Sequence, residues 1–142
     1  MPDLVPKFGT ATTLTTTGLS TLANGSSATS DAIDLTALLG FDVAVTLSAT
    51  TGASAVSGSL IRVYAKLSLD GTTYSTDEND YPMGVITLPA AAAQTVVKLF
   101  SVGAAFPGGI VPAFVKVRVR QDTSAALTDG SLTYQVISAQ SV

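Results

Sequence analysis

Three stretches of this sequence alternate between apolar side chains and polar or small ones with a period of two residues. They lie in residues 42–49, 60–69 and 114–120. A period of two is that of a β-strand with one face buried, whereas an amphipathic helix has a period of about 3.6 residues. The apolar faces consist of Val43, Val45, Leu47 and Ala49, of Ile61, Val63, Ala65, Leu67 and Leu69, and of Val115, Val117 and Val119. We therefore expect a chain that folds almost entirely as β-sheet.

Shorter segments with turn residues between them complete this pattern. Further strands are expected within residues 10–17, 30–39, 72–74, 85–88, 96–102 and 132–137. About eight or nine short strands separated by turns are typical of a β-sandwich or barrel, and the strand order stays open. Asp70-Gly71 follows an alternating strand and is typical of a two-residue type I′ hairpin turn, in which both residues have positive φ. Residues 72–74 are then expected to return beside that strand.

The first residues differ from the rest of the chain. Residues 1–9 contain Pro2 and Pro6 and few anchoring side chains, so we expect an extended N-terminal arm that contacts a neighbouring subunit. Residues 10–142 contain no linker and no repeat, and one β-sandwich domain is expected. The N-terminus lacks the pattern of a secretory signal, and the longest uncharged apolar stretch, residues 99–115, is interrupted by Pro and Gly. Synthesis in the cytoplasm and no membrane span are expected.

The composition narrows the chemistry that the chain can support. It has no His and no Cys, which removes Ser-His-Asp and Cys-His nucleophiles and the common zinc sites. Glu78 is the only Glu, and the Asp residues lie mostly at turns. We therefore expect a non-enzymatic protein with no catalytic residue, cofactor or metal site. The net charge of −3 offers no basic excess for nucleic acid, and a charged fraction of only 12% suits a component of a larger assembly.

Several groups of residues are candidate binding sites. Lys116, Arg118 and Arg120 form a cationic row on one strand face, which is either a solvated face or a strip that docks on an acidic partner. The acidic residues 77–80 form either a solvated loop or a source of oxygen ligands for calcium. The four tyrosines belong either to the packed rim or to a platform for sugars. In the arm, the expected contact residues are Pro2, Leu4, Val5, Pro6 and Phe8.

Three pieces of the sequence resemble small virion proteins of tailed bacteriophages. The first, residues 68–74, reads Ser-Leu-Asp-Gly-Thr-Thr-Tyr and matches that group's Ser-x-Asp-Gly-x-x-Tyr hairpin. The second joins residues 19–25 to residues 30–35. The third, residues 111–119 followed by 123–127, resembles a Leu-Pro-x-x-x-Lys-Val-x-Val strand and a Thr-Gly-Ala-x-Leu turn. Ser124 stands where Gly is common and Asp122 near a usual Asn, and these departures concern only the turn.

The resemblance implies a jelly-roll-like antiparallel β-sandwich that forms part of a virion. Among such proteins it implies a capsid cement, or decoration, protein on the outer capsid surface. Its partners would be the major capsid protein and further copies of itself in a dimer or trimer. Two other roles stay open, a tail or baseplate component of the same fold and a receptor- or carbohydrate-binding module. Fold-level likeness alone does not decide between them.

Overall fold

The computed structural model describes residues 3–36, 40–52, 60–88, 94–106 and 111–141. Each alternating stretch forms a long strand: β5 (Gly40–Thr51), β6 (Leu60–Ser68) and β9 (Phe114–Asp122). The other strands are β1 (Leu4–Phe8), β2 (Thr12–Leu14), β3 (Ser27–Thr29), β4 (Ile33–Asp34), β7 (Tyr81–Thr87), β8 (Thr95–Ser101) and β10 (Leu127–Ser141). Short 3₁₀ turns are η1 (Leu19–Thr21), η2 (Asp77–Asn79) and η3 (Gly103–Ala105). The prediction of a nearly all-β chain is confirmed.

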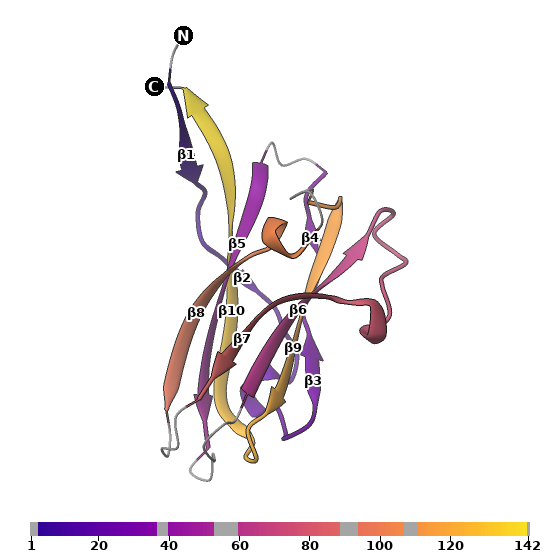
Figure 1. Ribbon diagram of the computed structural model, residues 1–142, viewed down its shortest axis with the longest axis vertical. Helices are drawn as coiled ribbons and strands as arrows, with labels where there is room; N and C mark the ends of the chain where they lie inside the picture. Colours follow the sequence, from indigo (N-terminus) through magenta and orange to yellow (C-terminus); the bar gives the residue numbers. More distant parts are fainter. Residues whose placement is uncertain (1–2, 37–39, 53–59, 89–93, 107–110, 142) are drawn as a thin grey trace.

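The strands form two antiparallel sheets packed as a sandwich (Figure 1). Sheet A has the order β1-β10-β5-β8, and β2 also pairs with β10; sheet B has the order β3-β9-β6-β7, and β4 also pairs with β9. Because β1 and β2 share one neighbour, and β3 and β4 another, each pair fills one strand position. The ten described strands then fill eight positions along the chain. In sheet A the first position lies beside the eighth, and in sheet B the second lies beside the seventh, which is the jelly-roll arrangement. The predicted fold class is correct.

The core lies between the two sheets and is built by the predicted apolar faces. Val45, Leu47, Val63 and Val117 are completely buried, and their neighbours along each strand point outward. Leu69 was expected on the same inner face, but 79% of it is exposed because β6 ends one residue earlier. Among the described residues, no helix is long and apolar enough to cross a membrane.

The N-terminal arm belongs to the chain's own sheet as an edge strand. β1 pairs antiparallel with the last part of β10, from Leu4 opposite Ser141 to Phe8 opposite Ile137. Pro6 is tolerated in this strand because an edge strand can spare one N–H donor. β5 stops pairing with β10 at Ser138. Beyond that residue, β10 and β1 continue as a two-stranded ribbon away from the sandwich (Figure 1). We call β1 with residues 137–141 the terminal ribbon.

The predicted two-residue hairpin at Asp70-Gly71 is wrong. β6 pairs with β7, and the connection between them runs from residue 69 to residue 80, with no strand at residues 72–74. Gly71 has the expected positive φ of 76°, but among the described non-glycine residues only Ser124 has one, which excludes a type I′ turn. The carboxylate of Asp70 shapes the turn instead, because it accepts hydrogen bonds from the backbone N–H groups of Thr72 and Thr73.

Candidate functional site

The predicted cationic row lies on the outer face of sheet B, where β9 runs between β3 and β6. Arg120 is exposed and Lys116 is half-buried, but Arg118 is only 5% exposed. The expectation that all three cations face solvent is therefore wrong for Arg118. The reason is the acidic segment 77–80, in which Asp77 pairs with Lys66 on β6 and Asp80 pairs with Arg118 on β9, so that it covers the middle of the row.

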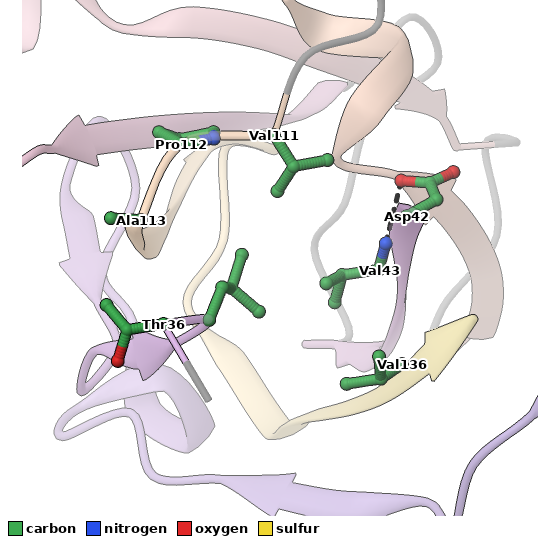
Figure 2. Close-up of a pocket in the computed structure, with 8 residues that line it drawn as sticks. Thr36, Asp42, Val43, Val111, Pro112, Ala113 and Val136 are labelled. Carbon is green, nitrogen blue, oxygen red and sulfur yellow. Dashed lines mark hydrogen bonds between the residues drawn. The ribbon is translucent and has the colours of Figure 1, made fainter. Parts of the chain in front are cut away.

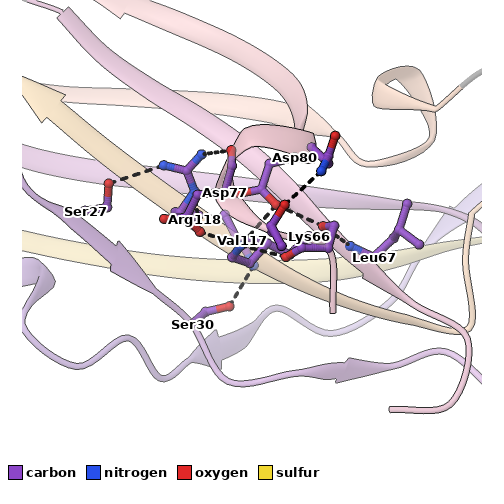
Figure 3. A network of polar contacts seen from close by, with 11 residues as sticks. Ser27, Ser30, Lys66, Leu67, Asp77, Asp80, Val117 and Arg118 are labelled. Atoms are coloured by element: carbon purple, nitrogen blue, oxygen red, sulfur yellow. Dashed lines mark hydrogen bonds and ion pairs between the residues drawn. The ribbon is translucent and has the colours of Figure 1, made fainter. Parts of the chain in front are cut away.

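Arg118 is held in a network of ion pairs and hydrogen bonds (Figure 3). Its Nε lies 2.6 Å from Asp80 Oδ2, its Nη2 donates to the backbone oxygen of Asp77 at 3.1 Å, and its Nη1 donates to Ser27 at 3.3 Å. Lys66 Nζ pairs with the other oxygen of Asp80 at 3.1 Å and with Asp77 at 2.6 Å. The Asp80 side chain is fully buried, and each of its two oxygens pairs with one of these cations.

This network bears on the alternative that the carboxylates of the acidic loop bind calcium. The hydrogen bond from Lys66 holds the pKa of Asp77 below its usual range, with further help from the charges of Arg118 and Lys66. Asp77 and Asp80 thus act as partners for two cations rather than as free ligands. In the part of the chain that the structure describes, no group of carboxylates is arranged to hold a metal ion.

The remaining cations of this face also have partners. Arg62 and Arg120 both pair with Asp122, the latter at 3.5 Å. Lys116 Nζ lies 4.4 Å from the centre of the Tyr74 ring, a cation–π contact. The row therefore does not form a strip of free positive charge. Between η2 and the sheet runs a groove of about 490 Å³, lined by Ser27, Arg62, Tyr64, Asp77, Glu78, Asp80, Arg118 and Arg120.

The terminal ribbon carries the apolar arm residues into solvent. All five residues of β1 are exposed, including Leu4 at 71% and Phe8 at 58%. Val5 and Pro6 lie between them on the same strand, whereas Pro2 lies outside the described residues. Of the predicted contact residues, the structure thus places Leu4, Val5, Pro6 and Phe8 together on one exposed edge strand. The cationic row lies on the other sheet.

A pocket of mixed polar and apolar lining, which the sequence did not predict, lies at the end of the sandwich (Figure 2). It has a volume of about 320 Å³ and is lined by Leu35, Thr36, Asp42, Val43, Val111, Pro112, Ala113 and Val136. Asp42 is at its margin, where its carboxylate accepts hydrogen bonds from Ser101 and from the backbone N–H of Gly103. These residues come from four strands or loops far apart in the sequence, so no local pattern could have indicated the pocket.

Comparisons with known proteins support the fold. No protein family and no curated protein matches the sequence. The solved structure of PBSX exported protein XepA matches 94% of this chain and 38% of its own, with a TM-score of 0.50 and 12% identity. BuGH86wt in complex with neoagarooctaose matches 96% of this chain and 20% of its own, with a TM-score of 0.52 and 9% identity. The chain spans well under half of either structure, and at these identities the likeness is one of fold alone.

Proposed function

We propose that this chain is a structural virion protein of a tailed bacteriophage, and within the virion a capsid cement protein on the outer surface of the shell. The observation that carries the proposal is the terminal ribbon, an exposed apolar edge strand that extends from a closed sandwich. Soluble domains usually protect such edges with charges or a covering loop. In β1, only Lys7 is charged, and both sides of that residue carry exposed apolar side chains.

The ribbon is suited to contact a neighbouring subunit. An edge strand offers free backbone N–H and C=O groups to a partner strand, and side chains such as Leu4 and Phe8 add apolar contacts. The sequence resemblance to small phage virion proteins supports the same role. So does the low charge of the chain, because an uncharged surface loses little hydration energy when it is buried in an assembly.

Mass action explains how such a protein would stabilise a shell. The major capsid protein is the proposed partner, and a protein that binds only the assembled lattice stabilises it by about 2.7 kcal/mol per site at a hundredfold excess over its dissociation constant. Many copies on one shell, each a small homo-oligomer, would add avidity to a weak contact. The proposed location is the capsid surface, after synthesis in the host cytoplasm.

The test is to strip the protein from purified virions, add it back, and follow DNA release on heating. Rebinding with a higher release temperature is the expected result. Leu4→Ser and Phe8→Ser should each lower occupancy, because both remove an apolar contact of the ribbon. Leu69→Ser is the matched control, since Leu69 is 79% exposed but lies in the loop after β6. No rebinding, or equal loss in all three variants, would reject the ribbon as a capsid contact.

A second candidate function, glycan binding, is favoured by the groove on sheet B. Arg62, Tyr64 and Glu78 line it, and guanidinium, ring and carboxylate groups together recognise sugars through stacking and hydrogen bonds. The test is binding to a glycan panel, with Glu78→Ala as the variant expected to lose it. Absence of binding to every glycan removes this candidate. A map of the virion would separate the capsid position from a tail or baseplate position.

A further inference from the structure

The outer face of sheet A differs from that of sheet B in its side chains. Two rows cross the sheet from β8 through β5 to β10, and side chains paired in register point to the same side. One row is Leu99, Thr46 and Thr133, and the other is Val97, Ser48 and Ser131. The alternate residues of β5, Val45 and Leu47, are completely buried in the core, so the two rows face outward. We call these six residues the uncharged face.

The charges of the two sheets are segregated. The outer face of sheet B carries five cations, Arg62, Lys66, Lys116, Arg118 and Arg120, with their carboxylate partners. The two rows of sheet A contain only Thr, Ser, Val and Leu. The nearest acidic positions along β5 and β10 are at the ends of the face, with Asp42 opposite Ile137 and Asp129 opposite Thr50. Between these two acidic positions, the rows on the outer face of sheet A carry no charge.

The uncharged face also exposes large apolar side chains. Val97 is 66% exposed and Leu99 is 58% exposed, two residues apart on β8. The Thr and Ser side chains beside them can donate and accept hydrogen bonds across an interface without a charge to desolvate. Interfaces between proteins have this composition at their centre, where charged residues are depleted.

We propose that the uncharged face binds the same face of a second copy of this chain, around a two-fold axis. A second copy presents no charge to this face, whereas a charged partner surface would lose its hydration without gaining an ion pair. The size suits a weak contact. From Asp42 to Thr50, the positions of β5 that bound the face, the strand rises by roughly 26 Å, and three strands are about 15 Å wide. The resulting area of roughly 400 Å² is about half the usual value of about 800 Å² per partner, so the dimer is expected to be weak.

The proposal predicts an unusual response to salt. The acidic groups near the dimer contact, Asp42 and Asp129, lie at its margin and have the same sign in both copies. Salt screens repulsion between like charges, so self-association should stay constant or strengthen slightly as salt is added. Weakening by salt would instead indicate that the copies meet through the cations of sheet B, and would overturn the proposal.

Sedimentation of the full chain, from micromolar to submillimolar concentration, tests the face directly. The chain should form a dimer, and Val97→Glu should raise its dissociation constant by about tenfold or more, because two copies would bury like charges. Val85→Glu is the matched control: Val85 is 41% exposed on β7, the edge strand of the other sheet, and this variant should dimerise normally. A monomer at all concentrations, or equal effects of both variants, overturns the proposal.

A second measurement does not depend on the stability of Val97→Glu. The chain has no Cys, so a single Cys can carry a spin label at one defined position. A label at Ser131→Cys should show dipolar broadening between copies, and a label at Val85→Cys should not. Dipolar broadening of the label at Val85→Cys, without broadening at Ser131→Cys, would overturn the proposed dimer face. Because the measurements use the pure chain, they are independent of capsid binding: a dimer that fails to bind capsids would reject the cement role and leave this inference standing.

Discussion

At the scale of single residues, the turn after β6 depends on two neighbours with different tasks. Gly71 adopts a φ of 76°, and a Cβ placed on it would lie 3.2 Å from the Phe114 ring. Asp70 holds the turn from the other side, because its Oδ1 accepts hydrogen bonds from Thr72 and Thr73 N–H at 2.8 Å and from the Ser68 hydroxyl. One residue is thus needed for its backbone freedom and the other for its acceptor oxygen.

Gly71→Val should therefore destabilise the domain by more than about 1 kcal/mol, because a β-branched residue is strained at positive φ. Gly18→Val is the informative control. Gly18 has a φ of 79°, but a Cβ there would meet nothing within 4 Å. Denaturant unfolding should show the larger loss for Gly71→Val, since only that variant also displaces the Phe114 ring. Equal midpoints for the two variants would mean that the ring contact contributes nothing, and an unchanged midpoint would contradict the turn itself.

The carboxylate of Asp70 gives stability a defined dependence on pH. Hydrogen bonds from the backbone of Thr73 and Thr72, and from Ser68, hold the pKa of Asp70 well below its usual range. A group whose pKa is lower in the folded state stabilises the protein above its unfolded pKa of about 3.9 and loses that effect as the pH falls. The difference in unfolding free energy between wild type and Asp70→Asn should be largest near neutral pH and shrink below about pH 4. A constant difference would show that the ionised form has no special role.

The same residues show how far local sequence reaches. The positive φ of Gly71 was predictable, because Asp-Gly strongly favours a turn. The turn type was not, because the Asp70 side chain replaces the strand pairing that a type I′ hairpin requires. Ser124 is a related case, because the structure gives this residue a φ of 63°, the conformation in which Gly is favoured.

At the scale of elements, β9 shows why one face of a strand is easier to predict than the other. Val115, Val117 and Val119 were predicted to be buried, and all three are completely buried. The burial of Arg118 on the opposite face could not be predicted, because its partner Asp80 lies 38 residues earlier in the chain. Alternation reports only which side of a strand faces the core. It carries no information about a segment such as η2 that crosses the outer side.

The network around residues 77–80 should make the stability of the domain sensitive to the loss of Asp80. Its side chain is fully buried between Lys66 and Arg118, whose side chains alone are 11% and 6% exposed. Asp80→Ala should destabilise the domain by about 3–5 kcal/mol, because two cations would stay buried without their carboxylate. Glu78→Ala, an exposed neighbour in the same segment, should change the unfolding free energy by less than about 0.5 kcal/mol. A small effect of Asp80→Ala would mean that water readily replaces the carboxylate.

At the scale of the whole molecule, the sandwich was predictable and its strand order was not. The order joins residues far apart in the chain, as where β10 runs between β5 and the two N-terminal strands. β10 also extends from Leu127 to Ser141, far beyond the expected residues 132–137, because β5, β2 and β1 pair with successive parts of it. Neither feature leaves a periodic signal in the local sequence, since both depend on long-range pairing.

The terminal ribbon leads to a prediction about the whole molecule. Deletion of residues 1–8 removes β1, whose five described residues are all exposed and pair only with residues 137–141 of β10. Little buried apolar area is lost, so the thermal midpoint should fall by less than about 4 °C, which corresponds to about 1 kcal/mol in a domain of this size. Capsid occupancy should fall strongly, because the deletion removes the apolar edge strand together with the pairing of β10.

Two measurements decide whether the ribbon has this role. Circular dichroism with a thermal scan checks the fold, and occupancy on stripped virions, measured at low and high salt, checks the contact. An apolar contact should respond little to salt, whereas a contact through Lys7 would weaken as salt rises. A deleted form that unfolds would show that the ribbon supports the sandwich. A folded form with full occupancy would remove the ribbon from the capsid contact and leave the outer face of sheet B, which the proposed dimer does not cover, as the surface through which this protein could join a shell.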